Sequence, residues 1–402
     1  MPDTGVVMPV YNQVPHILKA ALLSILEQTY KQFRLVIVID GANSLTRKTI
    51  FEIIKDQNDV IVLDKKNNEG VSKALNTGFQ HLIGYPDIQY LTWVSSDNIY
   101  YPNFLEALRN KLAASPPHIG LVYSSFRHIS ANGHPTQDEA ALKRFRQFQH
   151  QTRENLLNIC FIGVSFMYRK SAAIKIEGYH FEPVEDYEYW LRLTEVCDIT
   201  YLAQELMDYR VDAPESISKS LHENKQRHRW WRHQFNLARQ QARMRRGIPI
   251  ETTIFYPAPD TSDATIDALE RLLNQSYYNY RLVIVDETGM LGARLDELKI
   301  TDPRIERIAS NDKMMVLRNN VHTLKTAYAM IYGPSLPNDQ SLSHLVKIMK
   351  SLPFSKVHIA YIDSLKKTPQ LRPAARRQIP GVNELLYSIQ FKSLILNSRR
   401  MA

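Results

Sequence analysis

The sequence predicts an α/β protein with a mostly parallel sheet and flanking helices. Short apolar runs that suit strands alternate with segments in which apolar residues recur at helical spacing. The run Leu-Val-Ile-Val-Ile at 35–39 is continuously apolar, as in a parallel strand covered by helices on both faces. A similar series after residue 250 predicts a second, truncated α/β domain.

Strands and helices are expected in strict alternation over the first 94 residues. We expect strands at 5–10, 35–39, 60–63 and 89–94, with helices between them. This order requires right-handed crossovers within one sheet. Three polar loops follow the first, second and fourth of these strands, and they contain Tyr11, Asp40 and the segment 95–98. Because ligands bind outside the carboxyl ends of parallel strands, we expect a ligand site where these loops meet.

The composition restricts the class of protein. The chain has 402 residues, of which 44% are apolar, enough for two domains with buried cores. No run approaches the roughly 18 apolar residues that would span a bilayer. Cys160 and Cys197 form neither a disulfide framework nor a metal motif. We therefore predict a cytoplasmic protein, with no signal peptide visible before the first strand.

Two acidic segments carry the candidate chemistry. Asp97 lies in a Ser-Ser-Asp-Asn loop, where it could close an Asx-turn or hold a hard divalent cation. Glu185 and Asp186 precede a helical pattern, where they could stabilise the helix dipole or supply a general base. The glycine-rich dinucleotide fingerprint and the Walker A loop are both absent. A nucleotide site here would therefore use side chains and a metal.

Five motifs occur in series, at 7–12 (VMPVYN), 24–30 (SILEQTY), 68–78 (NEGVSKALNTG), 95–98 (SSDN) and 178–193 (GYHFEPVEDYEYWLRL). In this order and spacing they resemble family 2 glycosyltransferases of the GT-A fold, over roughly residues 4–220. The resemblance implies an inverting transferase that uses a nucleotide-diphosphate sugar together with Mg²⁺ or Mn²⁺.

The resemblance also implies roles for individual residues at matching positions. Asp97 would bind the metal, Asp186 would be the general base, and Glu185 would bind or orient the acceptor. Arg210 could contact phosphate or be a buried ion-pair partner, and Asp212 takes the place of a histidine that can touch metal or diphosphate. The residues implied to wall the base or lie beside the nucleotide are Pro9, Tyr11, Asp40, Asn68, Gly70, Asn76, Ser95 and Ser96.

Three departures from the family pattern concern the same site. Ser95 stands where the first aspartate of the metal motif is usual, Asn98 replaces a frequent trailing aspartate, and Gly41 replaces a frequent second aspartate after Asp40. We therefore expect a weak metal site that depends on Asp97.

The second half of the chain repeats the first. Residues 271–287 align without gaps to residues 24–40, with eight of 17 positions identical. The Ser-Asp-Asn loop falls on Gly333, Pro334 and Ser335, and residues 250–402 contain no Glu-Asp pair. We predict three parts: a GT-A domain at 1–220, a linker helix at 221–249, and a degenerate repeat at 250–402 that has a structural or partner-binding role.

The linker helix is strongly basic. Residues 222–246 contain eight Lys or Arg against one acidic residue. The segment could be an interdomain helix with a solvated basic face, or it could lie on anionic lipid, which would place the protein at the inner membrane face. Nucleic-acid binding is not expected, because no nucleic-acid motif accompanies the basic residues.

These observations predict an inverting glycosyltransferase that acts on a hydroxyl of a glycan or lipid-linked acceptor, in cell-surface polysaccharide or glycoconjugate synthesis. One alternative is an inactive glycan-binding or scaffold protein, which Ser95 and Gly41 favour. A sugar-nucleotide nucleotidyltransferase is a further alternative, but its glycine-rich, basic first loop is absent at Tyr11-Asn12-Gln13.

Overall fold

The computed structural model describes residues 1–57, 59–211, 221, 223–334, 336–352, 358–363, 366–373 and 380–397. Contacts divide the chain into two units, Met1–Ala242 and Arg243–Ala402, and each is described by itself. This boundary falls inside the segment 221–249, for which the sequence predicted a separate linker helix. The three-part division with limits at 220 and 250 stays a prediction.

The described residues of the first unit form an eight-stranded sheet in the order β3-β2-β1-β4-β7-β6-β8-β5. β1, β2, β3 and β4 are mutually parallel, as their apolar runs predicted, and β7 enters the sheet antiparallel to its two neighbours. The predicted α/β class with a mostly parallel sheet is therefore confirmed. The strands are β1 Thr4–Val10, β2 Phe33–Asp40, β3 Val60–Lys65, β4 Tyr90–Trp93, β5 Ile99–Tyr100, β6 Ile119–Ile129, β7 Phe166–Arg169 and β8 Asp198–Arg210.

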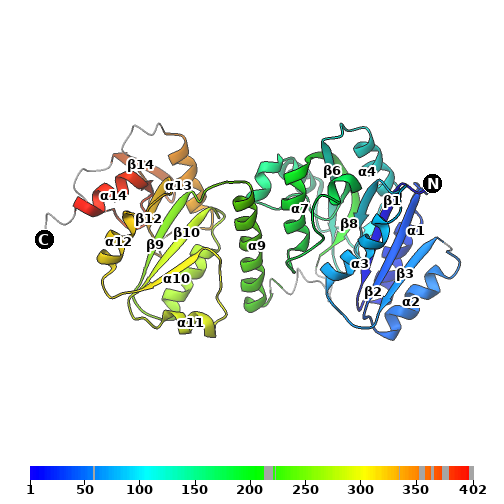
Figure 1. Cartoon of the computed structure of the whole chain (residues 1–402), viewed down its shortest axis with the longest axis horizontal. Helices are drawn as coiled ribbons and strands as arrows, with labels where there is room; N and C mark the ends of the chain where they lie inside the picture. The colour runs from blue at the N-terminus through cyan, green and yellow to red at the C-terminus, as the bar shows by residue number, and fades with distance from the viewer. Residues whose placement is uncertain are drawn as a thin grey trace. The chain divides into compact units, whose positions relative to one another are not determined.

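Helices cover both faces of this sheet (Figure 1). Alternation along β1 sends Val6 and Met8 into one core with α1, α2 and α4, and sends Val7 into the other core with α3, α7 and α9. The helices are α1 Pro15–Leu26, α2 Ser44–Ile54, α3 Val71–Ile83, α4 Phe104–Ala113, α5 Glu139–Gln149, the 3₁₀ helix η1 Arg153–Leu157, α6 Lys170–Ala173, α7 Glu185–Val196 and α9 Lys225–Arg245.

The sheet order brings three loops together at one edge. β1 lies between β2 and β4, with Val10 opposite Ile39 and Val7 opposite Trp93, so the loops after these strands are neighbours. β5 pairs with the end of β8, which places the backbone of Arg210 next to the loop that follows β4. This topology, rather than nearness in sequence, assembles the site.

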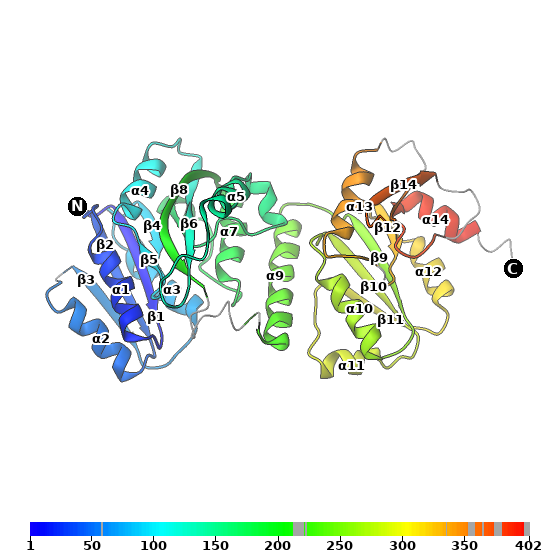
Figure 2. The ribbon, with the colours of Figure 1, turned by 180° about the vertical axis from the view of Figure 1, so that it is seen from behind.

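α9 lies beside α7 in both ribbon views (Figures 1 and 2). Ala238 and Ala242 of α9 are buried in the same core as the aromatic residues of α7. Three arginines of α9 are buried as well, because Arg232, Arg239 and Arg243 are only 3%, 2% and 7% exposed. The predicted solvated basic face is therefore wrong for these three residues.

The described residues of the second unit form a five-stranded sheet in the order β11-β10-β9-β12-β15. The strands of this unit are β9 Thr252–Ala258, β10 Tyr280–Asp286, β11 Ile305–Ala309, β12 Tyr328–Ile331, β13 His358–Ile362, β14 Pro369–Pro373 and β15 Leu386–Tyr387. Its helices are α10 Asp263–Leu273, α11 Leu291–Glu297, α12 Lys313–Val321, α13 Ser341–Lys350 and α14 Ser388–Asn397. The predicted second, truncated α/β region is confirmed.

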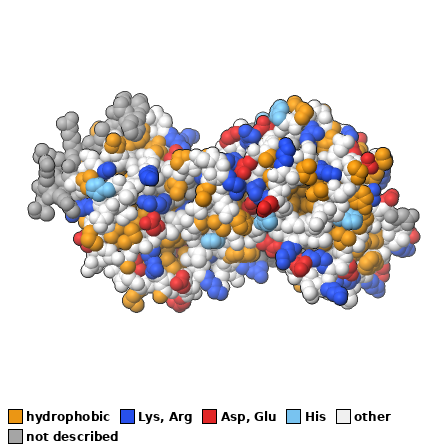
Figure 3. Space-filling model, in the orientation of Figure 1, with side chains coloured by type: hydrophobic (Ala, Val, Ile, Leu, Met, Phe, Trp, Pro, Cys, Tyr) orange, Lys and Arg blue, Asp and Glu red, His pale blue; other side chains and the backbone are white. Residues whose placement is uncertain are grey.

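Two features bear on the predicted location. No helix among the described residues is long and apolar enough to cross a membrane. The face of the first unit seen in Figure 3 carries Lys and Arg side chains interspersed with Asp and Glu. Contact of α9 with anionic lipid stays a prediction. Because three arginines of α9 are buried, the exposed basic residues that could make such a contact include Lys225, Arg227 and Arg245.

Candidate active site

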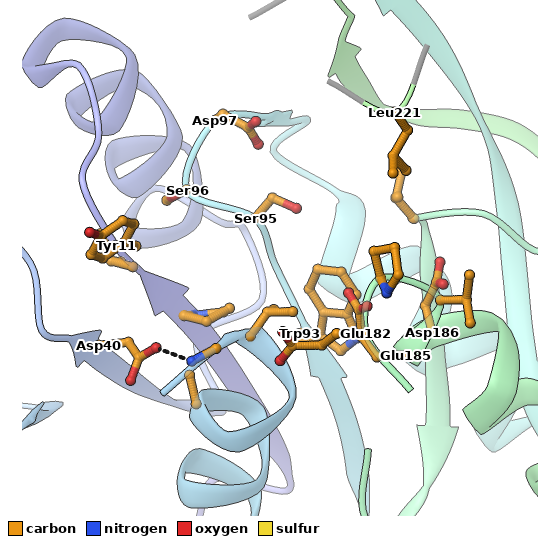
Figure 4. A pocket seen from close by; sticks show the side chains of 18 of the residues that line it. Tyr11, Asp40, Trp93, Ser95, Ser96, Asp97, Glu182, Glu185, Asp186 and Leu221 are labelled. Atoms are coloured by element: carbon orange, nitrogen blue, oxygen red, sulfur yellow. Dashed lines mark hydrogen bonds between the residues drawn. The ribbon is translucent and has the colours of Figure 1, made fainter. Parts of the chain in front are cut away.

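A cavity of about 650 Å³ opens at the carboxyl ends of β1, β2 and β4 (Figure 4). This volume lies in the range of small-molecule sites in proteins. In the close-up, Tyr11 and Asp40 lie at one end, and Glu182, Glu185 and Asp186 lie together at the other. The predicted site residues that line the cavity are Pro9, Tyr11, Asp40, Asn68, Gly70, Ser95, Ser96, Asp97, Glu185 and Asp186.

Asp40 fixes the loop at the first end of the cavity. It is the last residue of β2 and only 3% exposed. Its Oδ2 accepts hydrogen bonds from the backbone N–H groups of Glu69 at 3.1 Å and Gly70 at 2.9 Å. Its Oδ1 lies 3.0 Å from the Lys65 ammonium. The carboxylate thus holds the loop before α3 in place, while the side chain still borders the cavity.

Gly70 is required where this loop turns into α3. Its φ is +94°, a conformation that residues with a Cβ rarely adopt. A Cβ here would also lie only 2.4 Å from Oε1 of Glu182. That carboxylate accepts a hydrogen bond from Ser72 N–H at 2.9 Å, at the start of α3 where the helix dipole favours negative charge. The glycine therefore allows Glu182 to approach the helix end.

The Ser-Ser-Asp-Asn loop after β4 is braced from behind. The Tyr100 hydroxyl accepts a hydrogen bond from Ser95 N–H at 2.8 Å. The fully buried Asn98 accepts one from Arg210 N–H at 2.9 Å. The Arg210 guanidinium donates to the backbone carbonyl of Asp97 at 3.0 Å. These bonds fix the backbone of the loop, so Asp97 can face the cavity without itself serving as the turn's anchor.

Asp97 is the carboxylate of this loop that faces the cavity. Burial raises its pKa above the ordinary value, and the charge of Arg210 opposes that shift only in part. No described side chain forms an ion pair or hydrogen bond with the carboxylate. A desolvated carboxylate of this kind attracts a cation, and carboxylate oxygen is a ligand that Mg²⁺ and Mn²⁺ accept.

The side chains at this site fit a cation that takes most of its ligands from groups other than the protein. The described residues contain no group of three His, Cys, Asp or Glu side chains suited to a metal. One carboxylate is sufficient when diphosphate oxygens and water complete the octahedron. The chain thus fits a metal that arrives with its nucleotide. Asp212, the second predicted ligand, lies outside the described residues.

Glu185 and Asp186 begin α7 at the other end of the cavity. The helix N-terminus favours ionised carboxylates, but burial outweighs it. Burial raises the pKa of Glu185, and the neighbouring charges of Asp186 and Glu182 raise it further. Burial also raises the pKa of Asp186. Two crowded carboxyl groups with raised pKa values suit proton transfer, because a base must bind its proton firmly to remove one from a hydroxyl.

An aromatic row continues the wall beside Asp186. The Tyr187 ring of α7 stacks on the Phe235 ring of α9, with centroids 4.1 Å apart and an interplanar angle of 6°. Trp231, one turn earlier in α9, lies 4.9 Å from Phe235. All three rings line the cavity. α9 therefore forms part of the site.

Two predicted residues lie outside this cavity. Asn76 points away from it and pairs with the backbone of Tyr179, accepting from N–H at 2.7 Å and donating to the carbonyl at 3.0 Å. It borders a second cavity of about 300 Å³. Arg210 is 5% exposed, and its guanidinium donates to the carbonyls of Asp97, Ser130 and Ala131. In this structure both side chains bind protein backbone.

The sequence reasoning missed several residues of the cavity wall. Glu182 lies within a quoted motif, but nothing in the sequence pairs it with the start of α3. Trp231 and Phe235 belong to the segment that the sequence predicted only as a basic linker helix. Their i, i+4 spacing shows a common face but not what that face covers. Cys160 also borders the cavity, where burial raises the pKa of its thiol and the charge of Asp186 adds to the shift.

The sheet order and the cavity at the ends of its parallel strands agree with the predicted GT-A type of fold. Comparison with known families agrees, because residues 5–177 match the model of glycosyl transferase family 2. The predicted resemblance to this family is thus confirmed over residues 5–177, and the predicted enzyme class with it.

Curated relatives are named glycosyltransferases as well. An uncharacterized glycosyltransferase of Rickettsia typhi is 24% identical over 235 residues, which cover 57% of this chain and 70% of the relative. A UDP-Glc:alpha-D-GlcNAc-diphosphoundecaprenol beta-1,3-glucosyltransferase, WfgD of Escherichia coli, is 24% identical over 189 residues, covering 47% and 68%. The matched segment spans only 33% to 38% of three longer Rickettsia relatives.

Solved structures resemble part of the chain. The mannosyltransferase PcManGT from Pyrobaculum calidifontis, in complex with GDP-Man and Mn²⁺, is 16% identical with a TM-score of 0.45, covering 60% of this chain and 64% of that one. Residues 1–349 of Staphylococcus aureus TarS, in complex with UDP, are 15% identical with a TM-score of 0.42, covering 59% and 65%.

Proposed function

We propose that this protein is an inverting glycosyltransferase that moves a sugar from a nucleotide-diphosphate donor to a hydroxyl of a glycan or lipid-linked acceptor. One observation carries the proposal. Asp97 and Asp186 face a single cavity from different elements, the loop after β4 and the start of α7 (Figure 4). An inverting transfer of this kind needs a carboxylate to hold the cation that binds the leaving diphosphate. It also needs a base on the acceptor side.

The nucleotide would occupy the end of the cavity that Tyr11 and Asp40 border. Tyr11 is 50% exposed, so its ring is free to cover a base. Asp40 already accepts two backbone hydrogen bonds and pairs with Lys65. Its part would therefore be to hold the loop of Asn68 and Gly70 in shape around the nucleotide, in addition to any contact with the base that the family resemblance implies.

Asp97 would hold the divalent cation together with diphosphate oxygens. Bound there, Mg²⁺ or Mn²⁺ would offset the negative charge that develops on the departing diphosphate. Arg210 would act indirectly by donating to the Asp97 carbonyl, and Asn98 would tie the same loop to β8 by accepting from Arg210 N–H. The chain's own contribution at this end is a rigid loop that presents one carboxylate.

Asp186 would accept the proton of the attacking hydroxyl. The acceptor oxygen forms a bond to the anomeric carbon while the bond from that carbon to the diphosphate oxygen breaks. The proton moves to Asp186, and the electron pair leaves with the diphosphate. Because the attack comes from the side opposite the leaving group, the anomeric configuration inverts. Glu185 would accept a hydrogen bond from the acceptor and keep it in line.

The acceptor class rests on one relative. The Escherichia coli protein acts, by its printed name, on GlcNAc linked to diphosphoundecaprenol. This supports a sugar carried on a lipid diphosphate, and with it a role in cell-surface polysaccharide or glycoconjugate synthesis. The identity of sugar and base is left to experiment.

A donor screen tests the proposal. The full chain is incubated with UDP-, GDP- and dTDP-sugars and Mn²⁺, and released nucleotide diphosphate is measured with and without lipid-linked GlcNAc. We expect one donor class to be consumed faster when acceptor is present. An inactive binding protein would bind nucleotide-sugar without consuming it, and a nucleotidyltransferase would release pyrophosphate from a nucleoside triphosphate. Either result would contradict the proposal.

A further inference from the structure

We propose that α9 completes an acceptor subsite, in which Trp231 and Phe235 stack against a sugar ring of a carbohydrate acceptor. The inference rests on the proposed transferase function and adds the residues that select its second substrate. It concerns residues beyond 177, where the match to the family ends. The proposed subsite therefore lies outside the segment that matches the family model.

The aromatic row lies where an acceptor must bind. Tyr187 follows Asp186 directly in α7, and its ring stacks on Phe235 at 4.1 Å. Phe235 in turn contacts Trp231 at 4.9 Å. In the close-up, the labelled Leu221 lies on the Asp186 side of the cavity, away from Tyr11 and Asp40. The row and Leu221 thus border the end of the cavity opposite the nucleotide loops.

The row is held rigidly, as a stacking surface must be. Arg239 donates from Nε to the Tyr187 hydroxyl at 3.0 Å and from a terminal nitrogen to the Asn158 carbonyl at 2.7 Å. Its guanidinium also lies 4.1 Å from the centre of the Phe235 ring. A cation over an aromatic face is attracted to it. Arg239 is therefore a positioning residue that fixes Phe235 against Tyr187.

The neighbouring polar groups favour a sugar ring over a lipid chain. Glu182, Glu185 and Asp186 lie together in the cavity (Figure 4), and Asp186 directly precedes Tyr187 of the row. Oε2 of Glu185 is buried and has no hydrogen-bond partner among the described residues. A hydrocarbon chain would leave this oxygen desolvated without compensation, which is costly. A sugar instead offers hydroxyls to the carboxylates and a C–H face to the rings. The combination of an aromatic wall and hydrogen-bond acceptors matches that chemistry.

Two adjacent tryptophans provide a matched test. Trp231 lines the cavity, whereas Trp230 is 44% exposed and does not. We expect Trp231→Ala to raise the KM for acceptor by roughly ten-fold or more, as when a buried aromatic anchor is truncated. The KM for donor should change far less, because the row lies at the end of the cavity away from Tyr11 and Asp40. Trp231→Phe should restore most of the loss, and Trp230→Ala should behave as wild type.

Acceptor probes separate the sugar from the lipid. Methyl glycosides of hexoses and N-acetylhexosamines serve as ring-only acceptors, and citronellyl diphosphate serves as a lipid-only competitor. We expect at least one glycoside to be an acceptor whose KM depends on Trp231. The subsite is overturned if no glycoside accepts sugar, if Trp231→Ala leaves the glycoside KM unchanged, or if that variant relieves only the inhibition by citronellyl diphosphate. If wild-type protein consumes no nucleotide-sugar at all, the proposed function itself fails.

Discussion

The two units share a sheet but differ in what lies at its edge. β3-β2-β1-β4 in the first unit and β11-β10-β9-β12 in the second have the same order and are parallel throughout. The resemblance extends further. β15 pairs antiparallel with β12, just as β7 pairs antiparallel with β4. A bridge between Ala360 and Leu385 places β13 next to β15.

Side chains that hold the fold together recur at matching positions. Gln28 donates to the carbonyl of Tyr101 and accepts from Leu105 N–H at the start of α4. Gln275, 247 residues later in the sequence, donates to Asn338 and accepts from Leu342 at the start of α13. Each glutamine is buried and satisfies backbone groups that would otherwise lack partners.

A second matching pair reinforces the first. The Tyr30 hydroxyl donates to Asp3 at 2.6 Å, and the Tyr277 hydroxyl donates to Glu251 at 2.7 Å. In both units the bond ties the residue before the first strand to the loop before the second. The hydrogen bonds that define the fold have thus been kept in both halves.

The chemistry has not been kept. After β4 the first unit presents Asp97, whereas Gly333 and Pro334 follow β12 at the corresponding place. There Gly333 N–H donates to Asn383 at 3.0 Å, so the chain itself occupies that edge. Asp40 holds a loop that borders the cavity. In the second unit, Asp286, one position before the sequence counterpart Glu287, closes its own turn by accepting from Gly289 and Leu291. The hydrogen bonds shared by the two units and the proposed catalytic carboxylates therefore involve separate residues of one architecture.

Of the changes that separate the roles of the two units, replacing Asp97 should have the largest effect on activity. We expect Asp97→Ala to abolish transfer and to remove Mn²⁺ binding in the presence of nucleotide diphosphate, because Asp97 is the one carboxylate of the loop at 95–98. Electron paramagnetic resonance of Mn²⁺, with and without nucleotide diphosphate, measures this directly.

Glu287→Gln, at the corresponding sheet edge of the second unit, is the control and should change neither quantity. We expect one nucleotide site per wild-type chain in calorimetry. A second site, or tight Mn²⁺ binding by the nucleotide-free protein, would contradict the assignment of all chemistry to the first unit.

The pH dependence of transfer should reflect the carboxyl pair at the start of α7. The base must be ionised to act, and burial raises the pKa of Asp186. The value of kcat/KM should therefore fall as pH decreases, and the fall should begin above the pH at which an ordinary aspartate takes up a proton. Glu185→Gln should keep this limb, because burial raises the pKa of Asp186 and the substitution leaves Asp186 buried. A fall that begins only in the ordinary range of an aspartate would mean that a buried Asp186 does not govern the titration.

Replacing the two glutamines should have smaller effects that are alike in size. Gln28→Ala and Gln275→Ala each leave buried backbone groups without partners, which costs about 1–3 kcal/mol. All four tryptophans lie in the first unit, at 93, 190, 230 and 231, so their fluorescence in urea reports that unit, and circular dichroism reports both. Only Gln28→Ala should also lower activity, since Tyr101 closely follows the Asp97 loop. If Gln275→Ala lowered activity and Gln28→Ala did not, the assignment of activity to the first unit would be contradicted.

The sequence predicted what depends on periodicity and strand order. The continuous apolar run of β2 predicted a parallel strand, and the order of strands predicted that the loops of Tyr11, Asp40 and Asp97 would meet. Contacts between distant segments were beyond its reach. Arg210 was expected to meet phosphate or an acidic partner, but its guanidinium binds backbone carbonyls, because β8 pairs with β5.

The arginines of α9 illustrate the same limit. Charge alone suggested a solvated face, yet Arg239 is buried because Tyr187 and Asn158, which come from other elements, accept its hydrogen bonds. Glu182 was missed for a similar reason, since its partner Ser72 lies 110 residues away in the sequence. Residues whose role depends on such partners become visible only in the folded chain.

Replacing Asp186 with asparagine tests the central claim most directly, because the change keeps size and removes basicity. Transfer and donor affinity are measured on the full chain, with Glu195→Gln, an exposed position near the end of the same helix, as the control. We predict that Asp186→Asn abolishes transfer, leaves donor affinity within a few-fold of wild type, and that the control is fully active. Transfer by Asp186→Asn at a rate near that of wild type would contradict the account.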